Sequence, residues 1–100
     1  MERKLYQKFK DKITKADPNC WVYKIPDFAL GGKRPFDTFL VIQGKPFAIE
    51  FKSEDGTLTK YQSYQLMEFI NAGGEALVFW EGEETMDEFI KKIISELPTK

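Results

Sequence analysis

Three side chains near the middle of the sequence carry charges at a spacing that could build a hydrolytic site. Asp37 is followed thirteen positions later by Glu50, and Lys52 comes two positions after Glu50. All three occur among apolar residues, where charges are costly unless a metal ion or a substrate uses them. Two carboxylates can hold a divalent cation, and an ammonium group can stabilise negative charge on a substrate.

These residues lie in a predicted β-hairpin. Two runs of β-forming residues, 36–42 and 47–52, flank the turn residues Gln-Gly-Lys-Pro. The expected register places Asp37 opposite Lys52. Because side chains alternate between the two faces of a strand, Asp37, Glu50 and Lys52 are expected to emerge on the same face.

The same residues also fit a purely structural role. A lysine opposite an aspartate is a common cross-strand ion pair. The spacing alone therefore leaves two alternatives open: a surface salt bridge between Lys52 and Asp37, or a site that uses all three charges.

The composition restricts the chemistry that such a site can perform. The chain has no histidine, which excludes histidine general bases, serine–histidine triads and the usual histidine-bearing zinc sites. Its single cysteine, Cys20, permits no internal disulfide and fits a reducing compartment. Any metal would therefore bind to oxygen ligands, which favours Mg²⁺ or Mn²⁺.

Size and apolar content predict one domain over residues 1–100. Hydrophobic residues make up 42% of the chain and include nine phenylalanines, which indicates a packed core rather than disorder. No apolar run approaches the ~20 residues of a membrane helix, and the sequence opens with no signal-peptide pattern. We therefore expect a cytoplasmic protein.

Hydrophobic periodicity and turn residues predict elements in the order α-β-β-β-α-β-α. This order is typical of an α/β fold in which helices pack on a mixed sheet. The expected elements are a helix over 2–15, a strand over 20–25, hairpin strands over 36–42 and 47–52, a helix over 59–72, a strand over 76–80 and a final helix from residue 85.

The first predicted helix carries an acidic residue within its apolar stripe. Leu5, Tyr6, Phe9 and Ile13 form the stripe, and Glu2 projects onto its middle. Glu2 could complement the positive end of the helix dipole. Alternatively, it could point inward as a functional carboxylate, and the sequence leaves both roles open.

The second predicted helix also places polar residues in its apolar stripe. Gln62 and Gln65 fall among the residues that define this side, namely Leu58, Tyr61, Leu66, Phe69 and Ile70. Polar side chains there need partners. Thr59 and Gln62 match a capping box, which gives Gln62 a structural explanation; we expect a structural role for Gln65.

The spacing of the charged residues resembles a known nuclease signature. Asp37, Glu50 and Lys52 are similar to the acidic and basic residues of the PD-(D/E)xK nucleases. The sequence departs from that signature at its start, because Phe36 separates Pro35 from Asp37.

Asp27 competes with Asp37 for the first acidic position. It follows Pro26 directly and so forms a literal Pro-Asp pair, but it precedes Glu50 by 23 residues. The hairpin register brings Asp37, not Asp27, close to Glu50. We therefore prefer Asp37.

Segments downstream of the charged residues extend the resemblance. Residues 58–62 (LTKYQ) and 72–74 (AGG) resemble the helix and exit turn of the virus-type replication-repair nuclease (VRR-NUC) branch. Archaeal Holliday-junction resolvases are similar in layout. The resemblance covers residues 2–80, which is most of the chain.

The resemblance implies a restriction-endonuclease-like core and a metal-dependent deoxyribonuclease. It implies that Asp37 and Glu50 hold Mg²⁺ or Mn²⁺, with the Phe51 carbonyl as a further ligand. Lys52 would orient water or neutralise charge on the phosphate. Gln62 would lie at the rim of the site, and Glu2 is a further candidate for catalysis.

The resemblance also implies a DNA substrate, with branched or four-way junction DNA as the expected structure. Enzymes of this type act in repair or recombination and include phage-encoded stand-alone domains, which the small size of this chain fits. Cutting two strands by symmetric pairing implies a homodimer. The alternative is an inactive nuclease-like module that binds DNA or assembles with other proteins.

Basic residues concentrate in the N-terminal half. Residues 1–52 carry a net charge of +5 and residues 53–100 a net charge of −6, which sum to the −1 of the whole chain. Lys24, Lys33 and Arg34 are the expected contacts to nucleic-acid phosphates. Solvated faces of opposite sign explain the charge asymmetry equally well.

Overall fold

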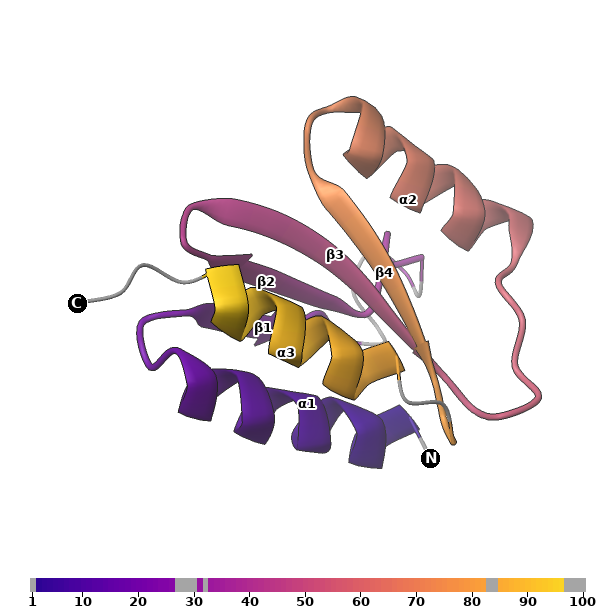
Figure 1. Ribbon diagram of the computed structural model, residues 1–100. Helices are drawn as coiled ribbons and strands as arrows, with labels where there is room; N and C mark the ends of the chain where they lie inside the picture. The colour runs from indigo at the N-terminus through magenta and orange to yellow at the C-terminus, as the bar shows by residue number, and fades with distance from the viewer. Residues whose placement is uncertain (1, 27–30, 32, 83–84, 97–100) are drawn as a thin grey trace.

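The computed structural model describes residues 2–26, 31, 33–82 and 85–96, without the side chains of Glu2, Arg3 and Ile94. Within these residues, the helices and strands follow the predicted α-β-β-β-α-β-α order (Figure 1). Their ends differ from the predicted ones by no more than two residues. The elements are α1 (Glu2–Ala16), β1 (Trp21–Lys24), β2 (Thr38–Ile42), β3 (Lys45–Lys52), α2 (Lys60–Asn71), β4 (Glu75–Trp80) and α3 (Thr85–Glu96).

The strands form one mixed sheet in the order β1-β2-β3-β4. β1 and β2 pair antiparallel, β2 and β3 pair antiparallel, and β3 and β4 pair parallel. The parallel pair exists because the chain crosses back through α2 between β3 and β4. β3 therefore has a partner on each side, and its residues from Phe47 to Phe51 are buried.

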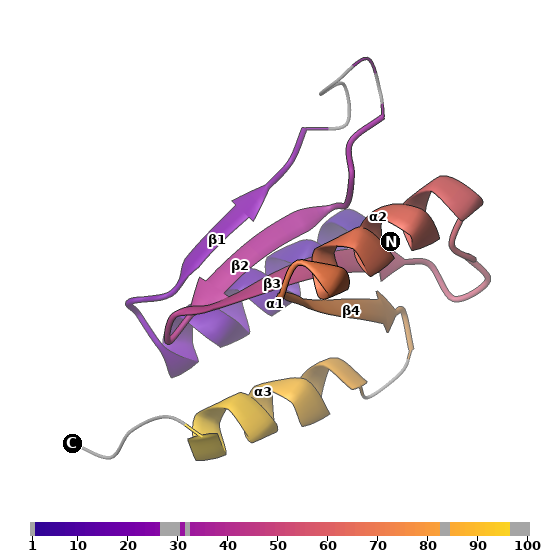
Figure 2. The ribbon, with the colours of Figure 1, turned by 90° about the horizontal axis from the view of Figure 1, so that it is seen from above.

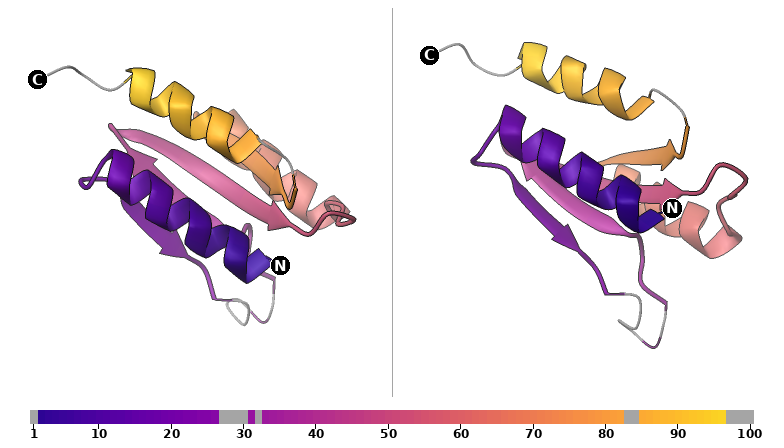
Figure 3. Two further views of the ribbon diagram at one scale, coloured as in Figure 1. Left: turned by 60° about the horizontal axis from the view of Figure 1, so that its bottom comes forward. Right: turned by 90° about the horizontal axis from the view of Figure 1, so that it is seen from below.

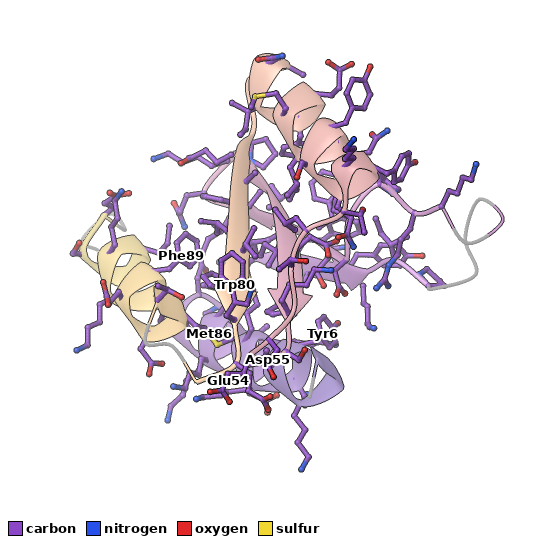
Figure 4. All side chains as sticks on the ribbon, turned by 90° about the vertical axis from the view of Figure 1, so that its right-hand side faces the viewer. Tyr6, Glu54, Asp55, Trp80, Met86 and Phe89 are labelled. Carbon is purple, nitrogen blue, oxygen red and sulfur yellow. The ribbon has the colours of Figure 1, made fainter. Side chains whose placement is uncertain are left out.

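Helices cover both faces of this sheet. α1 and α3 lie side by side on one face, and α2 lies on the other (Figures 1 and 3). Figure 4 shows Met86 and Phe89 of α3 pointing toward the sheet. The main core lies between α1, α3 and the sheet and comprises Phe9, Ile13, Leu40, Ile42, Phe47, Ile49, Phe51, Phe79, Met86, Ile90 and Ile93.

The predicted stripe of α1 faces this main core. Phe9 and Ile13 are completely buried, and the rings of Tyr6 and Phe9 lie 6.2 and 5.8 Å from the ring of Phe51. A smaller cluster between α2 and the opposite face of the sheet contains Phe36, Ala48 and Leu66. α1 thus covers the face of the sheet opposite to the one that α2 covers.

The hairpin register differs from the predicted one. Ile42 pairs with Lys45, so the loop contains only Gln43 and Gly44, which both have positive φ (52° and 76°). Such values are typical of a type I′ hairpin turn, whose twist matches that of the strands. Pro46 lies inside β3, at a position before β3 begins to pair with β4, so its missing N–H removes no bond of that ladder.

The corrected register moves every cross-strand partner by two residues. Asp37 therefore does not lie opposite Lys52, as predicted. A shift by two keeps each side chain on its expected face, because the side-chain period of a strand is two residues. The expectation that Asp37, Glu50 and Lys52 share a face thus survives the error in register.

The capping box at the start of α2 is present as predicted. The Thr59 hydroxyl accepts a hydrogen bond from Gln62 N at 3.1 Å, and Gln62 Oε1 accepts one from Thr59 N at 2.9 Å. The predicted apolar side of this helix was partly wrong. Leu66 is buried, but Tyr61 and Ile70 are exposed.

Within the described parts of the chain, no helix is both long enough and apolar enough to cross a membrane.

Candidate active site

Asp37 and Glu50 lie beside each other on the face of the sheet that α2 covers. The last pair of the β2–β3 ladder joins Thr38 to Ile49, so one further step along it sets Asp37 against Glu50. Each of these two acids is only 2% exposed. The fold thus brings together the two carboxylates that the sequence singled out.

This proximity changes the acidity of Glu50. Its pKa is raised from an ordinary 4.5 to about 7, chiefly by burial and then by the negative charge of Asp37. Lys52, Arg34 and a backbone hydrogen bond from Asp37 lower the pKa and offset part of this rise. A buried acid with such a raised pKa is typical of sites that bind a cation or move a proton.

The other acid buried within the described residues, Asp17, has a structural explanation. Its Oδ1 accepts a hydrogen bond from Asn19 N at 3.0 Å, and its Oδ2 accepts one from Gln43 Nε2 at 2.7 Å. These bonds tie the turn after α1 to the hairpin loop.

Two basic side chains lie next to Asp37. Arg34 Nη2 is 3.5 Å from Asp37 Oδ2, and Lys24 Nζ is 3.9 Å from Asp37 Oδ1. Arg34 is also fixed from Nη1, which donates a hydrogen bond to the Ile25 carbonyl at 2.8 Å. The sequence predicted these cations as contacts to nucleic acid, and the structure places both of them at the carboxylate pair.

Lys52 and Gln62 complete the site on the side of Glu50. Lys52 Nζ lies 4.0 Å from Glu50 Oε2 and donates a hydrogen bond to Gln62 Oε1 at 2.9 Å. Gln62 Nε2 in turn donates one to Glu50 Oε2 at 3.2 Å. Gln62 therefore caps α2 and contacts both charged residues, so the two roles considered from the sequence are compatible.

An open groove adjoins these residues. It has a volume of about 400 Å³ and is lined by Lys33, Arg34, Thr59, Tyr61 and Gln62. The Tyr61 hydroxyl donates a hydrogen bond to the Lys33 carbonyl at 2.8 Å, which ties the basic segment to the start of α2. Nothing in the helical periodicity signalled this contact, which joins residues 28 positions apart.

Other acidic residues considered from the sequence are placed differently. Glu54 and Asp55 are exposed in the turn after β3 (Figure 4). Asp27 lies outside the described residues, and so does the side chain of Glu2, although its backbone begins α1. The stripe of α1 packs on the face of the sheet opposite Asp37 and Glu50.

The residues present fit a hard divalent cation. Among the described residues, no group of three or more acidic or cysteine side chains is arranged as a metal cluster. Mg²⁺, however, is usually bound through one or two carboxylates and keeps several water ligands, and Asp37 and Glu50 supply such a pair. The Phe51 ring is fully buried on the opposite face, so this residue could contribute only its main chain.

Comparison with solved structures supports this architecture. The chain is similar to Hjc, a Holliday junction resolvase from the archaeal hyperthermophile Archaeoglobus fulgidus, with a TM-score of 0.54 and 18% sequence identity. The match covers 80% of this chain and 68% of the archaeal chain. This chain has a resolvase-like fold. At this level of identity the likeness concerns the fold alone.

Comparisons at the level of sequence gave no match. No protein-family model matches the chain, and no curated protein does. The roles of individual residues in the resolvase-like fold therefore rest on the geometry of the site.

Proposed function

We propose that this chain is a metal-dependent deoxyribonuclease that hydrolyses phosphodiester bonds. The observation that carries the proposal is the buried pair Asp37–Glu50 with Lys52 and Gln62 bonded into the same network. A protein that needed only a stable sheet would gain little from two like charges side by side in a water-poor position. The resolvase-like fold gives the proposal independent support.

The carboxylate pair would hold the metal ion. Bound Mg²⁺ or Mn²⁺ would polarise the phosphate and lower the pKa of a coordinated water. Asp37 and Glu50 would supply side-chain oxygens, and Phe51 a main-chain carbonyl. In the absence of a metal, Lys24 and Arg34 on one side and Lys52 on the other partly offset the negative charge of the pair.

The cations around the pair would act on the substrate. Lys52 is positioned to stabilise negative charge that develops on the phosphate in the transition state. Arg34 and Lys24 lie next to Asp37, and Lys33 lies in the groove beside it, so a DNA backbone could be held along this side. Gln62 would keep Glu50 and Lys52 in a fixed relative orientation.

The proposed substrate is branched DNA, with a four-way junction as the first candidate, and the proposed pathway is repair or recombination. The likeness to a Holliday junction resolvase supports this choice. A junction presents two backbones related by symmetry, so we also propose that the chain acts as a homodimer.

One set of incubations tests the proposal. The protein is mixed with linear duplex, single strand, flap and four-way junction of matched sequence, each with Mg²⁺, Mn²⁺, Ca²⁺ or EDTA. We expect cleavage of the branched substrates in Mg²⁺ and Mn²⁺, none in EDTA, and little in Ca²⁺, whose coordination is looser. Binding without cleavage under every condition would instead favour the inactive DNA-binding or assembly module.

A further inference from the structure

The edge of the sheet next to the candidate active site exposes two aromatic rings. Trp21 and Tyr23 of β1 are 52% and 47% exposed. Their rings are stacked, with centroids 5.6 Å apart and planes only 9° from parallel. A second ring contact holds Trp21 in place. The centroids of the Trp21 and Phe39 rings are 5.7 Å apart, in a T-shaped arrangement.

These rings lie on the same face of the sheet as the carboxylate pair. Tyr23 pairs with Phe39 across the β1–β2 ladder, and Phe39 and Asp37 share a face because they are two residues apart. Tyr23 is therefore displaced from Asp37 in two directions. Along the strands it lies two residues away, about 7 Å, and across the sheet it lies one strand away, about 5 Å. Trp21 lies one further step away in the same direction.

No helix among the described elements covers this part of the sheet. α2 packs against β4 and reaches β2 through Phe69, whose ring is 5.8 Å from Phe39. β1 is one of the two edge strands and lies on the side of the sheet away from α2 (Figure 2). Two large, nearly parallel rings are thus left half in water, although their apolar surface would be more stable if it were covered.

We infer that Trp21 and Tyr23 form a stacking platform for unpaired DNA bases next to the scissile phosphate. The inference rests on the proposed function and names the part of the substrate that is recognised there. Every nucleobase has a π-face, so stacking on aromatic rings binds unpaired bases without requiring a particular sequence. The bases of a continuous duplex are already stacked on one another and cannot occupy such a platform.

Charge supports an occupant that carries phosphates. Lys24, the residue directly after Tyr23, has its ammonium group 3.9 Å from Asp37 and 5.7 Å from the Tyr6 ring centroid. Arg34 contacts the other carboxylate oxygen of Asp37. A strand could therefore place a phosphate at these cations and the carboxylate pair while its neighbouring bases lie on the rings. A branch point offers such bases, which gives the proposed nuclease a physical basis for preferring branched over continuous DNA.

Binding measurements in EDTA test the inference without requiring catalysis. Fluorescence anisotropy would give the dissociation constants for a labelled single strand and for a blunt duplex that contains it. Trp21→Leu keeps apolar bulk but removes the π-face, and Trp21→Phe keeps a ring. We expect Trp21→Leu to weaken single-strand binding by a factor between about 5 and 150. Its duplex binding should stay within about twofold of that of the unchanged protein. Trp21→Phe should bind single strands with nearly the affinity of the unchanged protein.

A matched control is Tyr64→Leu, which removes a ring on α2 that is 60% exposed and should leave both dissociation constants unchanged. Unchanged single-strand binding by Trp21→Leu would overturn the inference, and so would an equal loss for single strand and duplex. If the rings instead bind a second copy of the chain, Trp21→Leu would lower the molar mass in light scattering without affecting single-strand affinity, which would also overturn it.

Together with the Mg²⁺ cleavage incubations, these binding measurements separate this inference from the proposed nuclease activity. Single-strand binding that depends on Trp21, without cleavage in Mg²⁺, would support the platform and refute the nuclease. Cleavage in Mg²⁺, with single-strand binding that does not depend on Trp21, would support the nuclease and refute the platform. Absence of DNA binding in EDTA together with absence of cleavage in Mg²⁺ would refute both.

Discussion

Gln62 Nε2 donates a hydrogen bond to Glu50 Oε2 over 3.2 Å and so connects the start of α2 to the buried carboxylate pair. The same side chain accepts hydrogen bonds from Lys52 Nζ and from the backbone of Thr59. The Gln62 amide thereby caps the N-terminus of α2 and orients both Glu50 and Lys52. This arrangement allows the structural and functional roles of Gln62 to be tested separately.

Thr59→Ala should weaken the cap but spare the site. The substitution removes the hydroxyl that accepts Gln62 N, which costs about 1 kcal/mol of unfolding free energy. Gln62→Met should cost a similar amount and also slow cleavage, because Glu50 and Lys52 lose their shared partner. Urea unfolding and single-turnover cleavage rates measure the two effects. Equal rates for the two variants would mean that Gln62 only caps the helix.

Substitutions in the charged triad should abolish most cleavage without unfolding the protein. Asp37→Asn and Glu50→Gln remove metal-binding charge, and Lys52→Ala removes the cation next to Glu50. Glu54→Gln, an exposed acid in the following turn, is the matched control and should cleave normally. Circular dichroism would check the fold of each variant. Near-normal Mg²⁺-dependent cleavage by any two of the triad variants would refute the assignment.

The raised pKa of Glu50 predicts how stability depends on pH without metal. Between its ordinary value of 4.5 and about 7, the folded protein holds a proton that the unfolded chain has released. The unfolding free energy contributed by this group should therefore fall as pH rises through that window, by up to about 3 kcal/mol. Above pH 7 the contribution is constant, because both states are ionised.

Glu50→Gln should remove this dependence. In EDTA at pH 8 the variant should melt at a higher temperature than the unchanged protein, and the difference should shrink toward pH 5. Thermal melts of both proteins and of Glu54→Gln from pH 4.5 to 8 measure the effect. A difference between Glu50→Gln and the unchanged protein that is constant with pH would contradict the raised pKa.

The substitution Glu2→Gln tests whether the first turn of α1 contributes to the site. If the Glu2 carboxylate adds to the metal site, Glu2→Gln should weaken Mg²⁺ affinity and slow cleavage, while metal-free stability stays equal or rises because a repulsion is removed. If it only complements the helix dipole, stability should fall by about 0.3–1 kcal/mol and the Mg²⁺ titration should not change. Glu88→Gln, in the first turn of α3, is the control for a pure dipole effect.

The exposed face of α2 bears on the proposed homodimer. The exposed large apolar side chains of α2 include Met67 and Ile70, which offer a surface for a second copy. We expect a homodimer in light scattering, and a shift toward monomer in Met67→Lys or Ile70→Lys because a buried lysine in the contact would be unpaired. Ser95→Lys on α3 is the control. A monomer at high micromolar concentration, with and without DNA, would contradict the prediction.

The sequence determined the order of the elements and the face on which each charge emerges. Both depend on local patterns: the helical stripe of α1, the alternation along β2 and β3, and the capping box at Thr59. Asp37, Glu50 and Lys52 were placed on one face even though the register was wrong, because a slip of two residues in a strand does not change which face a side chain occupies.

Only the tertiary structure decided which of these charges are neighbours. The hairpin loop has two residues, with Gln43 at positive φ and bonded to Asp17, and this contact joins residues 26 positions apart. That turn sets Asp37 against Glu50, whose pKa is raised first by burial and then by the charge of Asp37. Likewise, the contacts of Arg34 with Asp37 and of Tyr61 with Lys33 depend on how loops pack over the sheet. A local sequence pattern carries no information on such contacts, because they form between segments that meet only when the whole chain has folded.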